Sequence, residues 1–274
     1  MPARILVFHG IHELDLPLET FREQMRFIKD TFEVRSLQYA AENATDAIVL
    51  TFDDGLKNFM QAYPILQELQ LPATLFVCPK LVSEQKWIWN HNCRARLATL
   101  AIRDRVDFVD SLGLMSLDTE LIIWYMKNCG AHRRDQIISS LISRTGNFYP
   151  AFRESERYDM LTWADIKSLD DKLITIGSHS TSHQPLTTIS KTSLRFEVEA
   201  SKFWLESELS RDVDQFCYPE GMYNNFVVDC VTSSGYGLAV TLNNKPFERG
   251  GDFPLTIPRT RLPWTKEKNA NLGR

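Results

Sequence analysis

Two neighbouring carboxylates, Asp53 and Asp54, follow an apolar and β-branched run at residues 48–52 and precede Gly55. Two carboxylates at the end of a buried strand repel each other and lose solvation, so a positive partner is expected beside them. A divalent cation would give them different tasks, because one aspartate would bind the ion and the other would stay free as a base. An Asp-Gly turn that ends a strand is the alternative, and this stretch alone favours neither.

Two histidines, His179 and His183, stand four residues apart just after another β-like run at residues 173–177. On a helical turn, this spacing puts both imidazoles on one side, as in the HExxH zinc motif. The alternative is a pair of solvated loop histidines. Together with Asp54 they form a two-histidine, one-carboxylate set with positions left for water, which is typical of catalytic metals. We therefore predict a divalent metal site at Asp54, His179 and His183.

Short buried strands must position these side chains, and the chain alternates such strands with amphipathic helices. Strands are expected at residues 5–8, 34–37, 48–52, 73–77, 173–177, 215–218, 237–241 and 255–257. Helical spacing covers residues 18–32, 58–69, 191–209 and 225–233, and Thr162 is expected to cap a short helix. Strand, helix and strand between residues 48 and 77 form a βαβ unit, which implies parallel strands.

Unusual polar residues follow the predicted strands one after another: His9, Asp53 and Asp54, His179 and His183, Tyr218, and Arg259. In a parallel (β/α) barrel, the carboxyl ends of the strands open onto one face, which carries the active site. The sequence therefore predicts an α/β fold, a distorted parallel (β/α) barrel, with these residues converging in its mouth.

Residues 90–157 differ from the rest, since they contain helical runs at 94–102, 121–129 and 137–142 and no clear strand. We interpret them as a helical insertion in a single domain spanning residues 1–274, because no linker rich in Pro, Gly or Ser marks a boundary. Trp87 and Trp89, just before the insertion, either face the substrate or belong to the core.

Composition narrows the classes of partner and compartment. The chain has 274 residues, 43% of them hydrophobic, and a net charge of −4 without a Lys/Arg run, so no nucleic-acid partner is expected. Its five cysteines form no CxxC pair, which favours reduced thiols. No signal peptide or membrane span is apparent in the sequence, and we expect a cytoplasmic protein.

The chain resembles the polysaccharide deacetylase family, also described as the NodB homology domain or carbohydrate esterase family 4. Residues 51–55 (TFDDG) are similar to the family's first motif, residues 179–183 (HSTSH) to its second, H-[ST]-x-x-H, and residues 216–221 (FCYPEG) to its third, FxYPxG. The resemblance covers roughly residues 4–90 and 158–263. It implies a NodB-like barrel of seven or eight strands that removes an acyl group, chiefly acetyl, from an N-acylated sugar or oligosaccharide in polysaccharide or cell-envelope glycan synthesis.

The resemblance also implies roles for individual residues. Asp54, His179 and His183 would hold the metal, with zinc as the leading candidate, and Asp53 would act as general base. A backbone N–H near Tyr218 would lie against the oxyanion.

Two departures from the family pattern leave alternatives open. No arginine occupies the usual place near the third motif, so Arg259 is the candidate that could tether Asp53. His183 is the last histidine in the chain, so the family's late general acid is missing; His9 is the best replacement, although it could equally be a strand-end histidine bonded to backbone. His91 and His132, in the insertion, are weaker candidates. The alternative functions are a deformylase or other amidase acting on an N-acyl sugar or small molecule, and an idle carbohydrate-binding barrel. The intact Asp53 argues against an idle protein.

Overall fold

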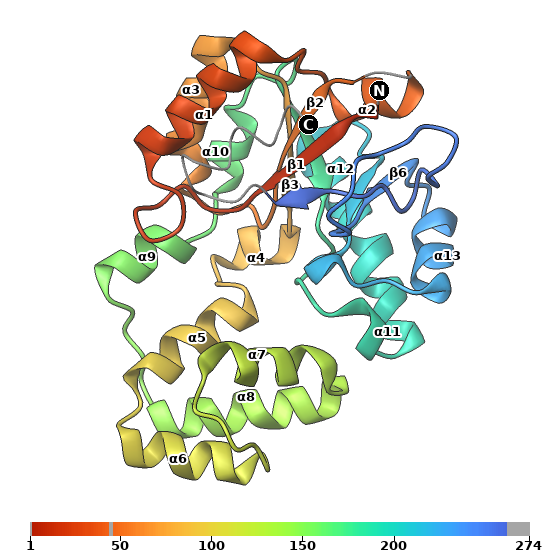
Figure 1. The fold of residues 1–274 in the computed structure, drawn as a ribbon. Helices are drawn as coiled ribbons and strands as arrows, with labels where there is room; N and C mark the ends of the chain where they lie inside the picture. The colour runs from red at the N-terminus through yellow and green to blue at the C-terminus, as the bar shows by residue number, and fades with distance from the viewer. Residues whose placement is uncertain (1, 44–45, 262–274) are drawn as a thin grey trace.

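The computed structural model describes residues 2–43 and 46–261, and within these ranges seven parallel strands form one curled half-barrel with helices outside it (Figure 1). The strands are β1 (Arg4–Phe8), β2 (Ile48–Phe52), β3 (Ala73–Val77), β4 (Ile174–Ser178), β5 (Gln215–Cys217), β6 (Leu238–Val240) and β7 (Thr260–Arg261). Their order is β6-β5-β4-β3-β2-β1-β7, and every paired neighbour is parallel. The predicted parallel α/β fold is confirmed.

The central strands are apolar along their whole length because both of their faces are covered. Every residue of β2 and β3 is buried. On the outer face, Phe8 stacks on Phe52 at 5.1 Å between ring centroids, and Phe21 and Phe59 pack edge-on against Phe52. These rings hold α1 (Leu18–Thr31) and α3 (Phe59–Leu69) against the sheet. Phe52, the last residue of β2, is therefore packed on several sides, and the position of the two aspartates that follow it is fixed.

The remaining helices around the sheet follow the predicted alternation. They are α2 (Leu37–Glu42), α4 (Pro79–Glu84), α10 (Trp163–Lys167), α11 (Lys191–Arg195), α12 (Ser201–Leu209) and α13 (Asn225–Ser233), with a π-helical turn at Phe196–Ala200 and 3-10 turns at Leu186–Thr188 and Pro219–Gly221. The predicted cap is confirmed, since the Thr162 side chain accepts from the Asp165 N–H.

Two predicted strands are wrong. In residues 34–37, only Val34 makes a bridge, to Ile48, because the Ser36 hydroxyl accepts the Tyr39 N–H and starts α2 there. In residues 255–257, only Ile257 bridges to Val240, and the paired strand comes later, after Pro258, which has no N–H to donate. Arg259 therefore precedes the last strand instead of ending it.

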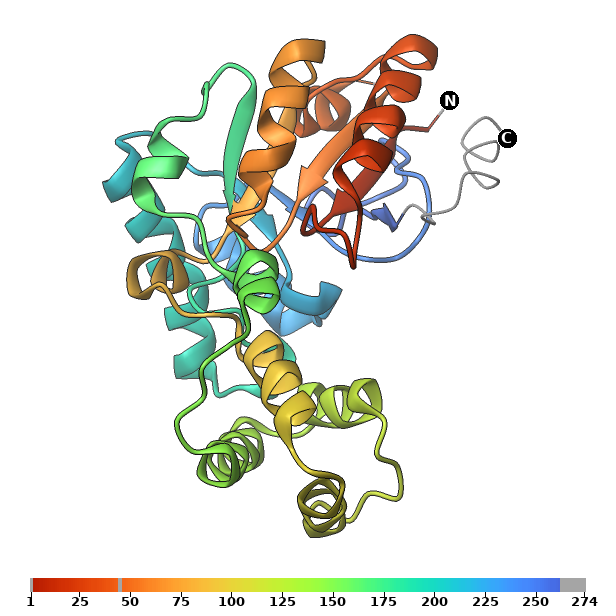
Figure 2. The same cartoon turned by 90° about the vertical axis from the view of Figure 1, so that its left-hand side faces the viewer.

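Between α4 and α10, the chain forms five helices, and the first four of them lie below the barrel (Figures 1 and 2). They are α5 (Trp89–Thr99), α6 (Ile102–Ser111), α7 (Thr119–Asn128), α8 (Ala131–Thr145) and α9 (Phe152–Tyr158). Apolar side chains of α5 to α8, among them Leu97, Phe108, Ile122 and Leu141, form a core cluster separate from that of the barrel. We refer to residues 89–158 as the helical segment. Its status as an insertion in a single domain stays a prediction.

No helix in the described ranges combines the length and apolar character needed to cross a membrane.

Candidate active site

Asp54 meets His179 and His183 at the carboxyl end of the sheet. Its Oδ1 lies 3.5 Å from His179 Nε2 and 3.3 Å from His183 Nε2. All three side chains are buried, and they come from the loops after β2 and β4. The structure therefore brings together the three residues predicted as metal ligands.

The loop after β4 aims the imidazoles by a turn instead of the predicted helix. Ser180 and His183 both have left-handed backbone conformations, with φ of 63° and 59°. Such conformations cost non-glycine residues about 1–3 kcal/mol and persist only where the surroundings hold them. Here the Ser180 hydroxyl accepts the His183 N–H at 3.1 Å. The two rings lie 4.8 Å apart at 81°.

A hydrogen bond fixes the ring of His179. Its Nδ1 lies 2.8 Å from the Cys217 carbonyl oxygen, which can only accept, so this nitrogen carries the proton. Nε2 then faces Asp54, where a metal ion would take the place of its proton, as binding to an imidazole requires.

The three ligand atoms fit a transition metal. Two ligands about 2.0–2.2 Å from a tetrahedral zinc ion lie about 3.3–3.6 Å apart, and the Asp54–histidine separations of 3.3 and 3.5 Å match this spacing. Within the described residues, Asp54 Oδ1 is buried without a hydrogen-bond partner. Burial would raise the pKa of Asp54, but the closeness of His179 and His183 outweighs it and holds that pKa well below its usual range. The carboxylate is therefore ionised, as a metal ligand must be.

Asp53 points to a different partner, Arg259. Arg259 Nη1 and Nη2 each donate to one Asp53 oxygen at 2.6 Å, and Nη1 also donates to the Thr51 hydroxyl at 3.0 Å. Arg259 is fully buried. Burial alone would raise the pKa of Asp53, but the Arg259 guanidinium outweighs it and lowers the pKa to about 2. Asp53 is therefore a fixed, ionised carboxylate beside the ligand set.

Cys217 contributes to the site, although the sequence analysis assigned it no role. Its Sγ lies 3.0 Å from Arg259 Nη2 and 3.6 Å from Asp53 Oδ2, while its carbonyl holds His179. Burial raises the pKa of this thiol, which is therefore protonated. Its position inside the third motif was the signal available in the sequence.

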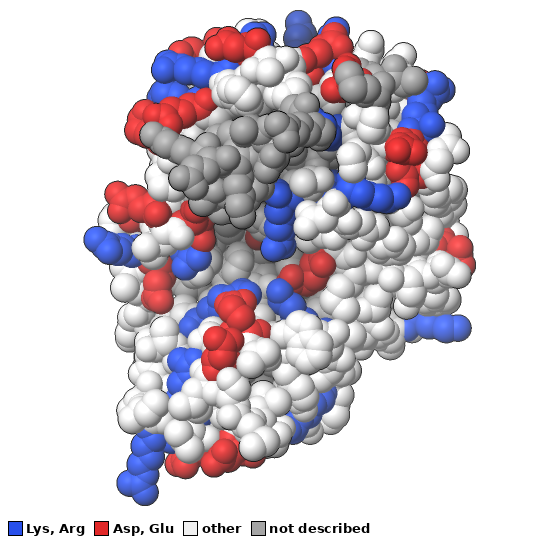
Figure 3. Space-filling view, viewed as in Figure 1, with Lys and Arg blue, Asp and Glu red and all other residues white. Residues whose placement is uncertain are grey.

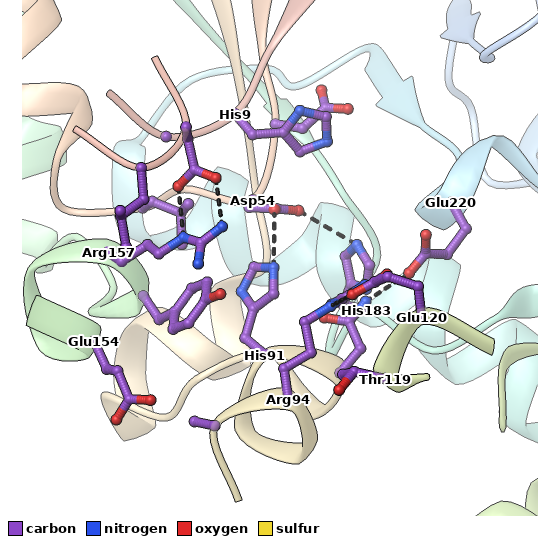
Figure 4. A pocket seen from close by; sticks show the side chains of 18 of the residues that line it. His9, Asp54, His91, Arg94, Thr119, Glu120, Glu154, Arg157, His183 and Glu220 are labelled. Atoms are coloured by element: carbon purple, nitrogen blue, oxygen red, sulfur yellow. Dashed lines mark hydrogen bonds and ion pairs between the residues drawn. The ribbon is translucent and has the colours of Figure 1, made fainter. Parts of the chain in front are cut away.

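Tyr218 and His9 lie in different environments. The Tyr218 side chain is fully buried, its hydroxyl donates to the Leu255 carbonyl at 2.8 Å, and its N–H donates to the Val240 carbonyl at 3.2 Å. His9 follows β1 and lines the cavity described next, near Asp54 (Figure 4). The catalytic roles of both residues stay predictions.

A cavity of about 830 Å³ opens over the two aspartates. The barrel supplies one wall, with His9, His179 and His183, and α5, α7 and α9 supply the other. Figure 3 shows the surface hollowed between barrel and helices, with charged side chains of both signs around the hollow. Six charged residues that line the cavity form ion pairs: Arg94 with Glu120 at 2.7 Å, Lys127 with Glu220 at 2.6 Å, and Arg157 with Asp15 at 2.6 Å.

His91, on the first turn of α5, reaches the site from the helical wall. Its Nε2 lies 3.9 Å from Asp54 Oδ2, and its ring stacks on Tyr158 at 4.5 Å (Figure 4). Burial lowers the pKa of His91 to about 3, so the ring is neutral. From the sequence, His91 is a weak candidate because it lies in the insertion, and no local pattern links it to Asp54. The other insertion histidine, His132, does not line the cavity; its Nε2 lies 3.1 Å from Gln136 Nε2.

Both the sequence and the fold of this chain are similar to those of known proteins. A family model described as polysaccharide deacetylase matches residues 40–239. No curated protein matches the chain. Among solved structures, the fold is similar to that of the Streptococcus pyogenes deacetylase PplD in complex with acetate, with a TM-score of 0.66, 19% identity and coverage of 100% of this chain and 99% of that one.

Two further solved structures have the same fold. IcaB from Ammonifex degensii has a TM-score of 0.64 and 16% identity, with 99% of this chain and 96% of that one covered. A de-N-acetylase from Aggregatibacter actinomycetemcomitans has a TM-score of 0.63 and 14% identity, with 99% and 100% covered.

Proposed function

This chain belongs to the polysaccharide deacetylase family, hydrolases of carbon–nitrogen bonds other than peptide bonds, and we propose that it removes the acetyl group from an N-acetylated sugar. One observation carries the proposal: an ionised Asp53, held by Arg259, lies beside the Asp54, His179 and His183 set under a single cavity. A barrel that only binds carbohydrate has no need for a clamped carboxylate next to its metal ligands.

Asp54, His179 and His183 would hold a divalent metal, and zinc suits two imidazoles and one carboxylate. When bound, such an ion polarises the amide carbonyl and lowers the pKa of water. Neighbouring groups of the protein orient the two histidine ligands. The Cys217 carbonyl orients His179, and the Ser180 hydroxyl holds the backbone of His183.

Asp53 would take the proton of the attacking water. Arg259 occupies one lone pair on each Asp53 oxygen and the Cys217 thiol donates to Oδ2, so the second lone pair of Oδ1 can accept a proton. The same contact fixes the direction of the carboxylate, so no reorientation is needed during the reaction.

The leaving amine needs a proton, and two histidines outside the predicted ligand set, His9 and His91, line the cavity near Asp54. Figure 4 shows His9 on one side of Asp54 and His91 on the other. Because burial keeps His91 neutral, it lacks the charged form that gives up a proton readily. We therefore assign the general acid to His9.

The test is the release of acetate from a panel of N-acetylated sugars by the purified, zinc-loaded protein. We expect release that a chelator abolishes, and an Asp53→Asn variant that binds zinc but releases no acetate. Formate release from N-formyl sugars without acetate release would instead identify a deformylase. Zinc binding with no acyl release from any amide would contradict the proposal and favour a carbohydrate-binding barrel.

A further inference from the structure

The first turn of α5 contacts three loops at the carboxyl end of the sheet, two of which carry the predicted metal ligands. Trp89 Nε1 donates to the His183 carbonyl at 3.1 Å, in the loop after β4. Asn90 Nδ2 donates to Glu220 Oε1 at 2.7 Å, in the loop after β5, and His91 lies 3.9 Å from Asp54, in the loop after β2. Three consecutive residues of the helical segment thus reach three separate loops of the barrel.

His183 depends on its backbone for orientation more than His179 does. A hydrogen bond from Nδ1 to the Cys217 carbonyl orients the ring of His179. The Nδ1 of His183 is buried and has no hydrogen-bond partner in the described part of the chain. No side-chain contact of this kind therefore turns the His183 ring toward Asp54, and the direction of the ring follows from its main chain.

That main chain is held at both ends. His183 has a φ of 59°, a left-handed conformation that needs support from its surroundings. The Ser180 hydroxyl accepts its N–H at 3.1 Å, and the Trp89 indole N–H donates to its carbonyl at 3.1 Å. The first of these contacts is local to the loop, whereas the second comes from the helical segment.

Trp89 is itself fixed by Arg134, a fully buried residue of α8. The Arg134 guanidinium lies over the indole ring, 5.6 Å from its centroid. It also donates to Gln184 Oε1 at 2.9 Å and to the Thr188 hydroxyl at 3.0 Å, in the residues that follow His183. Trp89 and Arg134 therefore hold the loop carrying His183 from two helices.

We propose that Trp89 is a positioning residue for the metal site, holding His183 in the geometry of a metal ligand through the His183 carbonyl. The inference rests on the proposed function, since it needs a metal at Asp54, His179 and His183. It makes the helical segment a working part of the metal centre, because the segment supplies a contact that the barrel loop does not make for itself.

The experiment measures zinc affinity by competition with a chromophoric chelator for the wild type and for Trp89→Phe, which removes the indole N–H but keeps an aromatic ring. We expect zinc to bind about 10-fold more weakly to Trp89→Phe, the lower end of the effect seen for contacts that orient metal ligands. Trp87→Phe is the matched control. Trp87 Nε1 donates to Asp159 Oδ1 at 2.7 Å, and Asp159 is not part of the loop after β4. The zinc affinity of Trp87→Phe should therefore equal that of the wild type.

Thermal unfolding of the metal-free proteins separates positioning from loss of fold, because we expect Trp89→Phe and Trp87→Phe to melt at similar temperatures. Arg134→Met is a second variant that leaves Trp89 in place but removes the group over its ring and the contacts to Gln184 and Thr188. It should also weaken zinc binding. Since the variant keeps a side chain of similar length in a buried position, it offers an independent test should Trp89→Phe fail to fold.

The His183→Ala variant distinguishes failure of the proposed metal site from failure of the positioning role of Trp89. Equal zinc affinity of the wild type and His183→Ala would overturn the proposed metal site, and this inference with it. Weaker binding by His183→Ala, together with unchanged binding by Trp89→Phe and Arg134→Met, would overturn the positioning role of Trp89 alone.

Discussion

Arg259 contacts both oxygens of Asp53, and this contact depends on the forked shape of the guanidinium. Lysine carries the same charge but cannot bond both oxygens in one plane. We therefore expect Arg259→Lys to lower kcat about 100-fold while zinc affinity stays unchanged, measured by acetate release and zinc titration. Arg211→Lys is the control, because Arg211 approaches Asp171 only at 3.9 Å, at the surface. An Arg259→Lys enzyme with full activity would show that the orientation of Asp53 is unimportant.

Ionisation of Asp53 also links stability to pH. Its pKa falls from an ordinary 3.8 to about 2 on folding, so the folded state favours the charged form. The resulting stabilisation, about 2 kcal/mol, is present above pH 4 and is lost as the pH falls from about 4 to about 2. Denaturant unfolding at these two pH values should show a smaller loss for Asp53→Asn than for the wild type. Equal losses would mean that Asp53 does not contribute.

The assignment of the general acid to His9 predicts different effects for substitutions at His9 and at His91. His9→Ala should lower kcat about 100-fold or more, within the range that general acids contribute, with little change in zinc affinity. His91→Ala should lower kcat less than about 10-fold. The pH dependence of kcat locates the effect, because loss of the acid removes the basic limb of the profile. A large loss in His91→Ala with a small one in His9→Ala would reverse the assignment.

At the scale of the element, the turn after β2 depends on one glycine. Gly55 has a φ of 70°, and a Cβ there would lie 2.9 Å from Val77 Cγ1 on β3. Alanine would therefore displace Val77 or the turn that carries Asp54, besides the cost of the backbone conformation. We expect Gly55→Ala to lower the free energy of unfolding by about 2–4 kcal/mol and to weaken zinc binding.

Gly113 provides the matched control for this substitution. It has a similar φ of 72°, but nothing lies within 4 Å of a Cβ built there. Gly113→Ala should therefore show only the backbone cost, about 1 kcal/mol, and normal zinc affinity. Denaturant unfolding and zinc titration of both variants provide the measurement. Equal losses in the two variants would show that the contact with Val77 has no effect.

At the scale of the whole molecule, the site joins segments that are far apart in the chain, and a bound metal should stabilise the entire fold. Free zinc at 100 times its dissociation constant adds about 2.7 kcal/mol to the stability of a protein that binds it only when folded. We expect zinc to raise the melting temperature of the wild type by several degrees and a chelator to reverse the rise. Asp54→Ala, which lacks a ligand, should show no shift; an equal shift would place the zinc elsewhere.

Much of the fold and site could be inferred from the sequence, because the relevant signals are local. Buried strands are short apolar runs. Asp53 and His179 follow two of these strands directly, and Asp54 and His183 come within five residues of a strand end. The strands predicted at residues 34–37 and 255–257 are wrong, although both segments contain apolar residues. Ser36 begins a helix at the first of them, and Pro258, which has no N–H, interrupts the hydrogen bonding after the second.

By itself, therefore, the sequence determined the parallel α/β architecture and the residues that follow its strands, since side-chain chemistry and hydrophobic period act over a few positions. It also raised Asp54, His179 and His183 as one site and Arg259 as a candidate partner of Asp53, but only the tertiary structure decided whether these residues meet and added the contacts of the helical segment. Arg259 lies 206 positions from Asp53, and Trp89 lies 94 positions from His183. Such contacts depend on how helices pack on the sheet, and no short-range pattern encodes that packing. The helical segment, which the sequence presented as an addition to the barrel, contacts each of the loops that carry Asp54, His183 and Glu220.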